Sequence, residues 1–379
     1  MCGLRLRLQS QRGGCPPWTI SWIEPFLRRT TELTLEFWEP ERLSHRFVDE
    51  LFRCSMPSLL VLTLYASQNE RNTTGVLVQE KTPNLHTIIS VCWPVELGER
   101  DQGVLSSVRK LDVVRHRWIG NRELGLWARA FPGLENLVMN TMDFGLAPMR
   151  VTLAPSRYLA LERRGGPVAF PRVTSVVLKG RIAAGGLDGL HLPAVSKADL
   201  DLTNHPDNQG RVNSSLSFLE SAVFSAPGIS ASLLDLRVIN IATDDVFLVI
   251  LRQLPLLERL TLWTRAMRSS FCAAMSTSDA AGQWLLPRLF SFNVEALWYQ
   301  ERNTGWMGIL VHMIQARRQA AREGGGLTFL RAVNVQWALR PTQTAFMLWL
   351  LRWQRQHCSF KYVCCQQTRR TFTDNELVM

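Results

Sequence analysis

Residues 254–262 read Leu254-Pro255-Leu256-Leu257-Glu258-Arg259-Leu260-Thr261-Leu262. The pattern is an apolar residue, Pro, any residue, an aliphatic, two further residues and then aliphatic-x-aliphatic. It occurs again, with Pro in the same place, at 56–64, 131–139, 170–178 and 286–294. Looser copies end at Leu35, Ser90, Val113, Leu200, Val238 and Val335, and Leu4-Arg5-Leu6-Arg7-Leu8 has the form of the end of one more. Eleven copies in order indicate a repeat protein.

The spacing and form of the copies predict the repeating unit. Their last positions lie 22 to 41 residues apart, and most spacings fall in or near the roughly 20–29 residues of leucine-rich repeats. Aliphatic-x-aliphatic has a period of two, which predicts a short strand with two inward side chains. We expect the Pro to end a preceding helix and to keep the connection extended. Stacking such units in one direction builds a parallel sheet with helices on its other side.

Helices are predicted between the strands from apolar residues at helical spacing. The predicted ranges are 41–54, 121–131, 215–224 and 246–254, the last capped by Thr243-Asp244-Asp245. A longer helix is predicted over 305–322, closed by Gly324-Gly325-Gly326. Two segments that break the rhythm, 147–167 and 264–284, are predicted as protruding loops.

The C-terminal part has a different character. A second apolar helix is predicted over 344–357, then a closing strand over 359–363 and a polar tail. We therefore assign residues 1–340 to a degenerate array of about eleven repeats and residues 341–379 to a C-terminal cap and tail. The predicted fold class is α/β: a leucine-rich-repeat solenoid, or horseshoe, with a parallel concave sheet, helices on the convex side and a helical C-terminal cap.

The charge of the chain is basic but dispersed. The 379 residues carry a formal net charge of +11, and 38 of the 43 cationic residues are Arg. The arginines occur singly or in pairs, which argues against a nucleic-acid-binding tail or a polybasic membrane anchor. We interpret them as solvated surface, with a basic face that steers an acidic partner as the alternative. Neither a membrane-length apolar run nor a signal-peptide pattern is found, so the expected location is cytoplasmic or nuclear.

Chemical motifs are missing from the sequence. The eight cysteines have no C-x-x-C spacing, so most are predicted to be buried apolar residues, and a soft-metal or redox site at Cys358, Cys364 and Cys365 stays open as an alternative. The seven histidines are dispersed, and no phosphate-loop, dinucleotide, zinc-protease or nucleophile-elbow phrase occurs. We therefore expect no enzyme activity, no cofactor and no metal.

The predicted binding surface is the concave face of the sheet. In each repeat, the residues between and just beyond the inward aliphatics point to this face. Many of them are charged or aromatic, and the mixture of charge signs argues against nucleic acid and favours a protein partner. The candidate partner-binding residues are Glu36, Tyr65, Asp112, Asn140, Lys179, Asp199, Asp201, Asp235, Arg237, Arg259, Trp263 and Glu295.

The repeats resemble those of fungal F-box/leucine-rich-repeat proteins, especially the large families of mushroom-forming fungi. The resemblance rests on the apolar-Pro-x-Leu-x-x-Leu-x-Leu phrase and covers roughly residues 22–340. It implies a ubiquitin-ligase substrate receptor, in which an F-box docks on the ligase adaptor and the repeats hold a target. An F-box needs a helical segment of its own, and none fits before Leu4. The alternatives are a repeat-only binding protein without a ligase link, or a truncated gene product.

Overall fold

The structure is a computed structural model. The chain forms two compact units, of which the first consists mainly of residues up to Val195 and the second mainly of residues from Ser196 onward. Both contain parallel strands and helices. The residues that it describes are 3–9, 20–37, 43–66, 77, 79–92, 104–115, 121–141, 168–180, 190–201, 232–239, 243, 245–264, 267–296, 305–337, 363–366 and 368–371.

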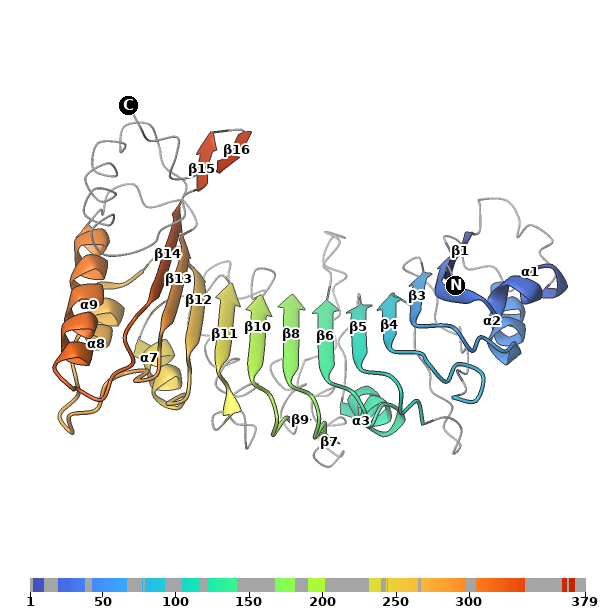
Figure 1. Ribbon diagram of the computed structural model, residues 1–379, viewed down its shortest axis with the longest axis horizontal. Helices are drawn as coiled ribbons and strands as arrows, with labels where there is room; N and C mark the ends of the chain where they lie inside the picture. The colour runs from blue at the N-terminus through green and yellow to red at the C-terminus, as the bar shows by residue number, and fades with distance from the viewer. Residues whose placement is uncertain are drawn as a thin grey trace, which may run out of the picture. The chain divides into compact units, whose positions relative to one another are not determined.

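The first unit contains a parallel sheet whose strands follow the order of the chain (Figure 1). Each strand pairs in parallel with the next. A separate small parallel pair joins β7 (Val168–Ala169) to β9 (Leu190–His191). The seven sheet strands are β1 (Leu4–Gln9), β2 (Thr30–Phe37), β3 (Val61–Ala66), β4 (Thr87–Val91), β5 (Lys110–Arg115), β6 (Asn136–Thr141) and β8 (Ser175–Gly180).

The second unit has the same parallel order from β10 to β14. Its strands are β10 (Lys197–Asp201), β11 (Asp235–Ile239), β12 (Arg259–Thr264), β13 (Ser291–Ala296) and β14 (Ala332–Trp337). Toward the C-terminus, β15 (Val363–Gln366) pairs antiparallel with β16 (Thr368–Thr371). The prediction of a polar tail after residue 363 is therefore wrong in part, because the tail begins with a hairpin of two strands.

Every copy of the repeat phrase coincides with a strand. The eleven copies correspond to eleven strands, and residues 4–8 form the twelfth, β1. Among the described strands, β1 pairs with β2 alone and β14 with β13 alone, so the parallel sheets do not close into a barrel. The predictions of an α/β class and of parallel strands in sequence order are confirmed, and this arrangement is compatible with a solenoid.

Where a phrase contains Pro, it begins with a tight turn that has Pro in the second position. Leu134 N donates to Phe131 O over 3.0 Å, and Leu257 N donates to Leu254 O over 3.1 Å. The fixed φ of Pro suits the second position of such a turn. The expectation of an extended connection at Pro is therefore wrong: the chain reverses there, and the apolar residues at both ends of the turn are buried.

The predicted helices that fall within the described residues are present. They are α2 (Leu43–Arg53), α3 (Asn121–Ala130), α7 (Asp245–Arg252) and α9 (Gly305–Arg322), and α1 (Ile20–Leu27) is a further helix. After α9, Gly325 N donates to Ala320 O over 2.9 Å while Gly324 has a positive φ of 80°, which only glycine adopts without strain. The helices predicted at 215–224 and 344–357, the loop at 147–167 and residues 359–362 lie outside the described residues.

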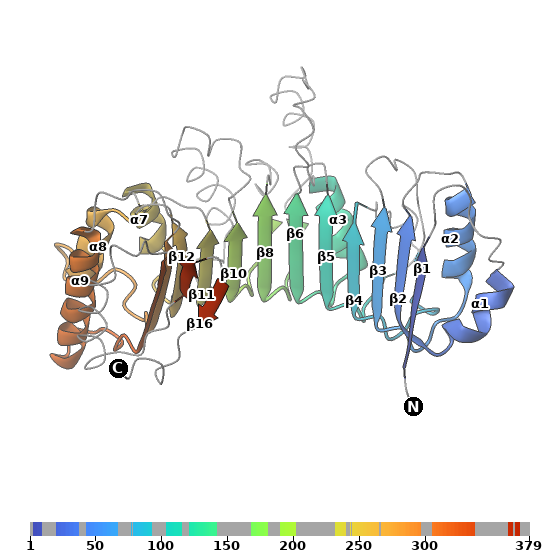
Figure 2. The same ribbon diagram turned by 90° about the horizontal axis from the view of Figure 1, so that it is seen from above.

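The segment 264–284 is not a protruding loop, as the sequence predicts, but contains helix α8 (Ser269–Ser276). Its Phe271 is fully buried, with its ring centroid 6.2 Å from Phe247 of α7 and 6.3 Å from Phe292 of β13. Figures 1 and 2 show α8 beside α9. The small and polar residues of this segment give no clear helical pattern in the sequence. The helix packs against its neighbours through only a few side chains, of which Phe271, Cys272 and Met275 are 0% exposed.

Arg317 of α9 is an exception to the surface interpretation of the arginines, since it is 0% exposed. Its guanidinium donates to the carbonyls of Met275 (3.3 Å), Leu285 (2.8 Å) and Leu286 (2.7 Å). Burial lowers the pKa of Arg317 to about 10, so the side chain remains a cation at neutral pH. This buried cation joins α9 to the end of α8 and to the turn that precedes β13.

Candidate interaction surface

Residues of the strands divide between two faces because side chains alternate along a strand. One set, including Leu62, Leu111 and Val176, is buried against the rest of its unit. The alternating set is partly exposed, and we call it the open face. In-register parallel pairing arranges the open face in rows that cross the strands. In the first unit, the middle row runs Thr63, Ile89, Asp112, Val138 and Val177.

The open face of the first unit carries aliphatic side chains in its middle row, among polar and charged neighbours. In its middle row, Ile89, Val138 and Val177 are partly exposed. Val138 and Val177 are register partners on β6 and β8, so their side chains are separated by about the 4.8 Å spacing of adjacent strands. Val138 and Val177 therefore form a small apolar patch, and Asp112 lies between this patch and Ile89. Apolar groups of this kind are typical of the central part of a protein interface.

Charged groups flank this aliphatic row. Asp112 lies in the middle row between Ile89 and Val138. Burial raises the pKa of the Asp112 carboxyl, and the cations Lys110 and Lys179 act in the opposite direction. The carboxylate therefore lies in a poorly solvated position that the two lysines only partly offset. A cationic group on a partner, brought to this point, would relieve that cost.

The open face of the second unit is polar, and its side chains pair across the strands. Arg237 Nη1 donates to Asp199 Oδ2 over 3.2 Å. Arg259 Nη1 lies 3.7 Å from Asp235 Oδ2. On the next strands, Asn293 Nδ2 donates to Thr261 Oγ1 over 3.0 Å. These contacts join successive repeats, and they occupy groups that a partner would otherwise use.

One atom of this polar face has no partner. The second carboxylate oxygen of Asp199, Oδ1, is buried and accepts no hydrogen bond within the described residues. A carboxylate oxygen without a donor is costly in a low-dielectric position. The Asp199–Arg237 contact is therefore incomplete, which limits its contribution to stability.

The predicted site residues fall on the open faces as expected from their phrases. Five of them lie in the first unit, where Glu36 neighbours Tyr65 and Asn140 neighbours Lys179 in register. The other seven lie in the second unit, and the register places four of them in two neighbouring pairs, Asp199 with Arg237 and Asp235 with Arg259. The rest are Asp112 of the first unit and Asp201, Trp263 and Glu295 of the second, where Trp263 and Glu295 are register partners.

Some of these residues have partners inside the protein. Glu36 Oε2 accepts a hydrogen bond from Arg7 Nη2 over 2.7 Å. The residues selected from the sequence do not include the aliphatic side chains of the open face, such as Ile89, Val138 and Val177 of the middle row. These three residues occupy the same outward positions of the phrase as the selected residues. The selection favoured polar residues, whereas the register of the strands shows that these aliphatic residues also lie on the open face.

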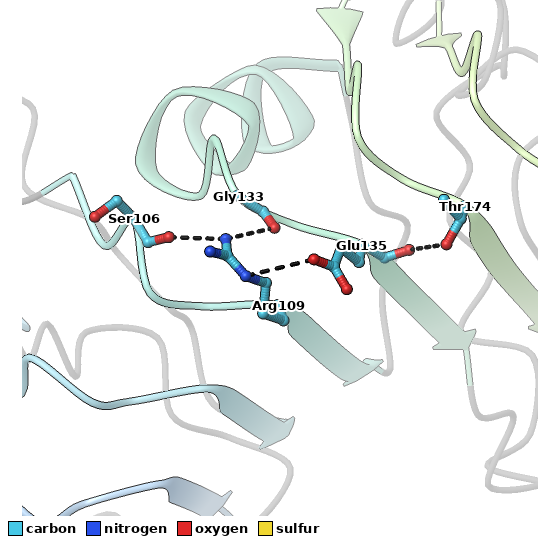
Figure 3. Close-up of polar contacts among 5 residues, drawn as sticks. All are labelled: Ser106, Arg109, Gly133, Glu135 and Thr174. Carbon is cyan, nitrogen blue, oxygen red and sulfur yellow. Dashed lines mark hydrogen bonds and ion pairs between the residues drawn. The ribbon is translucent and has the colours of Figure 1, made fainter.

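A polar cluster at the start of β5, β6 and β8 joins the turns that lead into these strands (Figure 3). Arg109 Nη1 donates to the carbonyls of Ser106 and Gly133, both over 2.9 Å, and Arg109 Nε lies 3.4 Å from Glu135 Oε1. The Glu135 carbonyl in turn accepts a hydrogen bond from Thr174 Oγ1 over 3.4 Å. The cluster thus connects the turns that begin three successive repeats, and it aligns the starts of the strands that carry the open face.

The described residues offer little reactive chemistry. Among them, no group of three His, Cys, Asp or Glu side chains is placed to hold a metal ion. Cys272 is buried as predicted, which raises its pKa to about 12, so this thiol is protonated at neutral pH. Cys54 and Cys92 are only partly buried, so the prediction of buried apolar cysteines does not hold for them. Two of the three cysteines of the alternative soft-metal or redox site, Cys364 and Cys365, lie in β15. The third, Cys358, is outside the described residues, so this alternative is not tested. No helix of the described chain has the length and apolarity to cross a membrane.

A scan against protein-family models finds no match to this chain, and no curated protein matches it. A functional argument therefore rests on the repeat phrase and on the geometry of the open faces.

Proposed function

We propose that this chain is a protein-interaction scaffold of the leucine-rich-repeat class, which binds a protein partner on the open face of its sheet. The observation that supports the proposal most strongly is the set of partly exposed aliphatic side chains in the middle row of the first unit, Ile89, Val138 and Val177, with Asp112 between Ile89 and Val138. Partly exposed aliphatics without strand-to-strand polar contacts are available to a partner, and burying them releases ordered water.

The repeat-class assignment is supported by the coincidence of every phrase copy with a strand. In such an array no unit buries its apolar face alone, so the ends need capping, and the proposed C-terminal cap is residues 341–379. The specific version of the proposal follows the resemblance to fungal F-box proteins: the open face is the target-binding part of a ubiquitin-ligase receptor. The chain then acts in the cytoplasm or nucleus, and it is a binding protein rather than an enzyme.

Site-specific photo-crosslinking tests the binding face. A photoreactive phenylalanine replaces Val138 in one variant and Val249, a partly exposed valine of α7, in a control variant. We expect a defined adduct in cells from Val138 and none from Val249. Equal labelling from both positions, or labelling from Val249 alone, contradicts the proposed face.

The identified partner then allows a quantitative comparison of the two faces. The variant V138D places a charge in the aliphatic row, and we expect it to weaken binding at least about tenfold. Joint charge reversal of Asp199, Asp201 and Arg237 tests the polar face selected from the sequence. A larger loss from this triple variant than from V138D would move the partner site to the second unit.

The ligase link has its own test. The chain is co-expressed with the ligase adaptor, and co-purification is measured. We expect the adaptor not to co-purify, while the crosslinked partner still binds, which would support a repeat-only binding protein. Co-purification would assign the adaptor-docking function to this chain itself.

A further inference from the structure

The first strand of the sheet has an incompletely covered core face. Leu4, Leu6 and Leu8 of β1 are partly exposed, whereas Leu33 and Leu35, which hold the same positions on β2, are 0% exposed. Among the described strands, β1 pairs with β2 alone. Within the part of the chain that the structure describes, its other edge presents backbone N–H and C=O groups next to half-buried leucines, which is a template for pairing with another strand.

Charge does not protect this edge, although two arginines lie on β1. Arg5 Nε is 3.0 Å from Glu32 Oε2, and Arg7 Nη2 is 2.7 Å from Glu36 Oε2. Both glutamates lie on β2, the neighbouring strand. Charged side chains usually prevent edge-to-edge pairing, but here each arginine lies within ion-pair distance of a glutamate on β2, which reduces the repulsion that an approaching strand meets on the open face.

Helix α1 adds aromatic surface at the same end of the molecule. Trp22 is 73% exposed and Phe26 is 54% exposed, the two largest of the exposed aromatic side chains in the described residues. Backbone hydrogen bonds connect this helix to β1: Arg29 N donates to Phe26 O over 3.0 Å, and Leu4 N donates to Arg29 O over 3.2 Å. Exposed aromatic side chains beside an apolar edge are typical anchors of a protein interface.

We propose that this end is the interface of a homodimer, in which β1 pairs antiparallel with β1 of a second copy. The argument for a second copy is the sequence of the strand. Leu4-Arg5-Leu6-Arg7-Leu8 reads the same in both directions, so a two-fold axis at Leu6 places Leu6 opposite Leu6 and Leu4 opposite Leu8. Leucines then remain on the core face of both copies, and the interface is isologous and closed.

Oligomeric state measured by light scattering after size-exclusion chromatography is the first test. We expect wild type to be a dimer that dissociates on dilution. L6K places two like charges opposite each other at the axis, and we expect dimerisation at least about tenfold weaker. V249K is the matched control, because Val249 is an exposed valine 45% accessible on α7, and it should stay dimeric.

Mixing variants separates an interface role from a folding role. L6E alone should be monomeric for the same reason as L6K, and a mixture of the two should form a heterodimer, because Lys then faces Glu across the axis. A monomeric wild type at all concentrations would overturn the proposal, and so would an L6K variant that dimerises as wild type does. Oligomers of steadily growing mass would also overturn it, since they indicate head-to-tail association.

The register is tested by cysteine crosslinking, which needs no change of charge. In a C2S/C15S background, L6C places two thiols opposite each other within the range that a disulfide can bridge. L8C is the control, because its two copies would lie roughly 14 Å apart along the strands. Mild oxidation should give a covalent dimer from L6C and not from L8C. Equal crosslinking of both, or none from L6C, overturns the two-fold pairing at Leu6.

Discussion

The open faces of the two units are built on the same repeat phrase but use their side chains differently. In the first unit, Ile89, Val138 and Val177 lie in the middle row, the ion pairs Arg5–Glu32 and Arg7–Glu36 join β1 to β2, and the polar cluster around Arg109 lies among the turns where strands begin. In the second unit, polar side chains pair across the face itself, as Arg237 does with Asp199. The difference teaches that a polar residue on such a face is not by itself evidence of a binding site, because its partner can be the next repeat.

The comparison predicts that polar groups of the second unit contribute to its stability. We expect the largest loss of stability from substitution of a buried polar residue of that unit, Arg317. The variant R317M leaves the carbonyls of Met275, Leu285 and Leu286 without their donor. We expect a loss of about 3 to 5 kcal/mol in the free energy of unfolding of this unit. Urea unfolding followed by hydrogen exchange measures it, with protection in the first unit unchanged.

The control is R288M, which removes an exposed arginine from a nearby turn. A long unbranched side chain is kept in both variants, so they differ chiefly in burial. Equal stability of R317M and R288M would show that the buried guanidinium is not needed to join α8 and α9.

In the first unit, we expect the largest loss of stability from a substitution in the turns at the start of its strands. In G133A, the added Cβ would overlap Arg109 Nη1 and lie 2.5 Å from the Ser106 carbonyl oxygen. We expect a loss of about 1 to 3 kcal/mol in the free energy of unfolding, because the guanidinium must leave two carbonyls. In an R109A background the cost should be smaller, though not zero, since the Ser106 carbonyl remains. Full additivity of the two changes would contradict the contact shown in Figure 3.

The ion pair on the polar face should have a smaller effect. D199A removes the acceptor of Arg237, and we expect a loss of about 0.5 to 1 kcal/mol, the usual range for a partly exposed pair. A double-mutant cycle with R237A measures the coupling between the two side chains. No coupling would mean that the second unit's polar face is not internally satisfied, and that its residues are as available to a partner as those of the first unit.

The smallest change in stability is expected from Asp112, on the open face of the first unit, where a substitution should stabilise the protein rather than destabilise it. Because burial raises the pKa of Asp112 above the ordinary 3.8, the folded chain binds this proton more tightly than the unfolded chain. Wild type therefore loses stability as the pH rises through the raised pKa. D112N should be more stable at neutral pH, by less than about 1 kcal/mol for a half-exposed group.

The pH dependence gives the check for Asp112. Chemical unfolding at several pH values should show the advantage of D112N shrinking as the pH falls toward 3.8 and below, where both states of wild type are protonated. A destabilised D112N at neutral pH would show that the Asp112 carboxylate takes part in a stabilising ion pair, as Asp199 does with Arg237, and would remove this contrast between the open faces of the two units.

Periodicity predicted much of the fold because the signals are local. Two-residue alternation, often after a Pro, marks the strands of the parallel sheet order from β1 to β14 apart from β7 and β9, and helical spacing marks α2, α3, α7 and α9. Helix α8 was missed because its sequence, SSFCAAMS, has small and polar residues, and its helical form depends on the packing of Phe271 between two other aromatic rings. The antiparallel pair β15–β16 was missed for a similar reason, since pairing of short polar segments has little sequence signal.

The candidate site was only partly predictable. The phrase positions identify which residues alternate outward, and all twelve selected residues lie in strands. The selection kept polar residues and left out Ile89, Val138 and Val177, because hydrophobicity alone assigns an aliphatic residue to the core. It also kept Glu36 and Asp199, whose carboxylates accept hydrogen bonds from Arg7 and Arg237.

By itself, the sequence determined the repeat, the parallel order of the strands and the positions that alternate between two faces, because these depend on the period of the side chains along one chain. The tertiary structure alone decided which of those side chains meet. The pairing of Asp199 with Arg237, the burial of Arg317 and the exposure of Leu6 at the first strand depend on register and on neighbours far away in the chain. Such contacts have no period to reveal them, and they distinguish a surface satisfied by its own protein from one that is available to another.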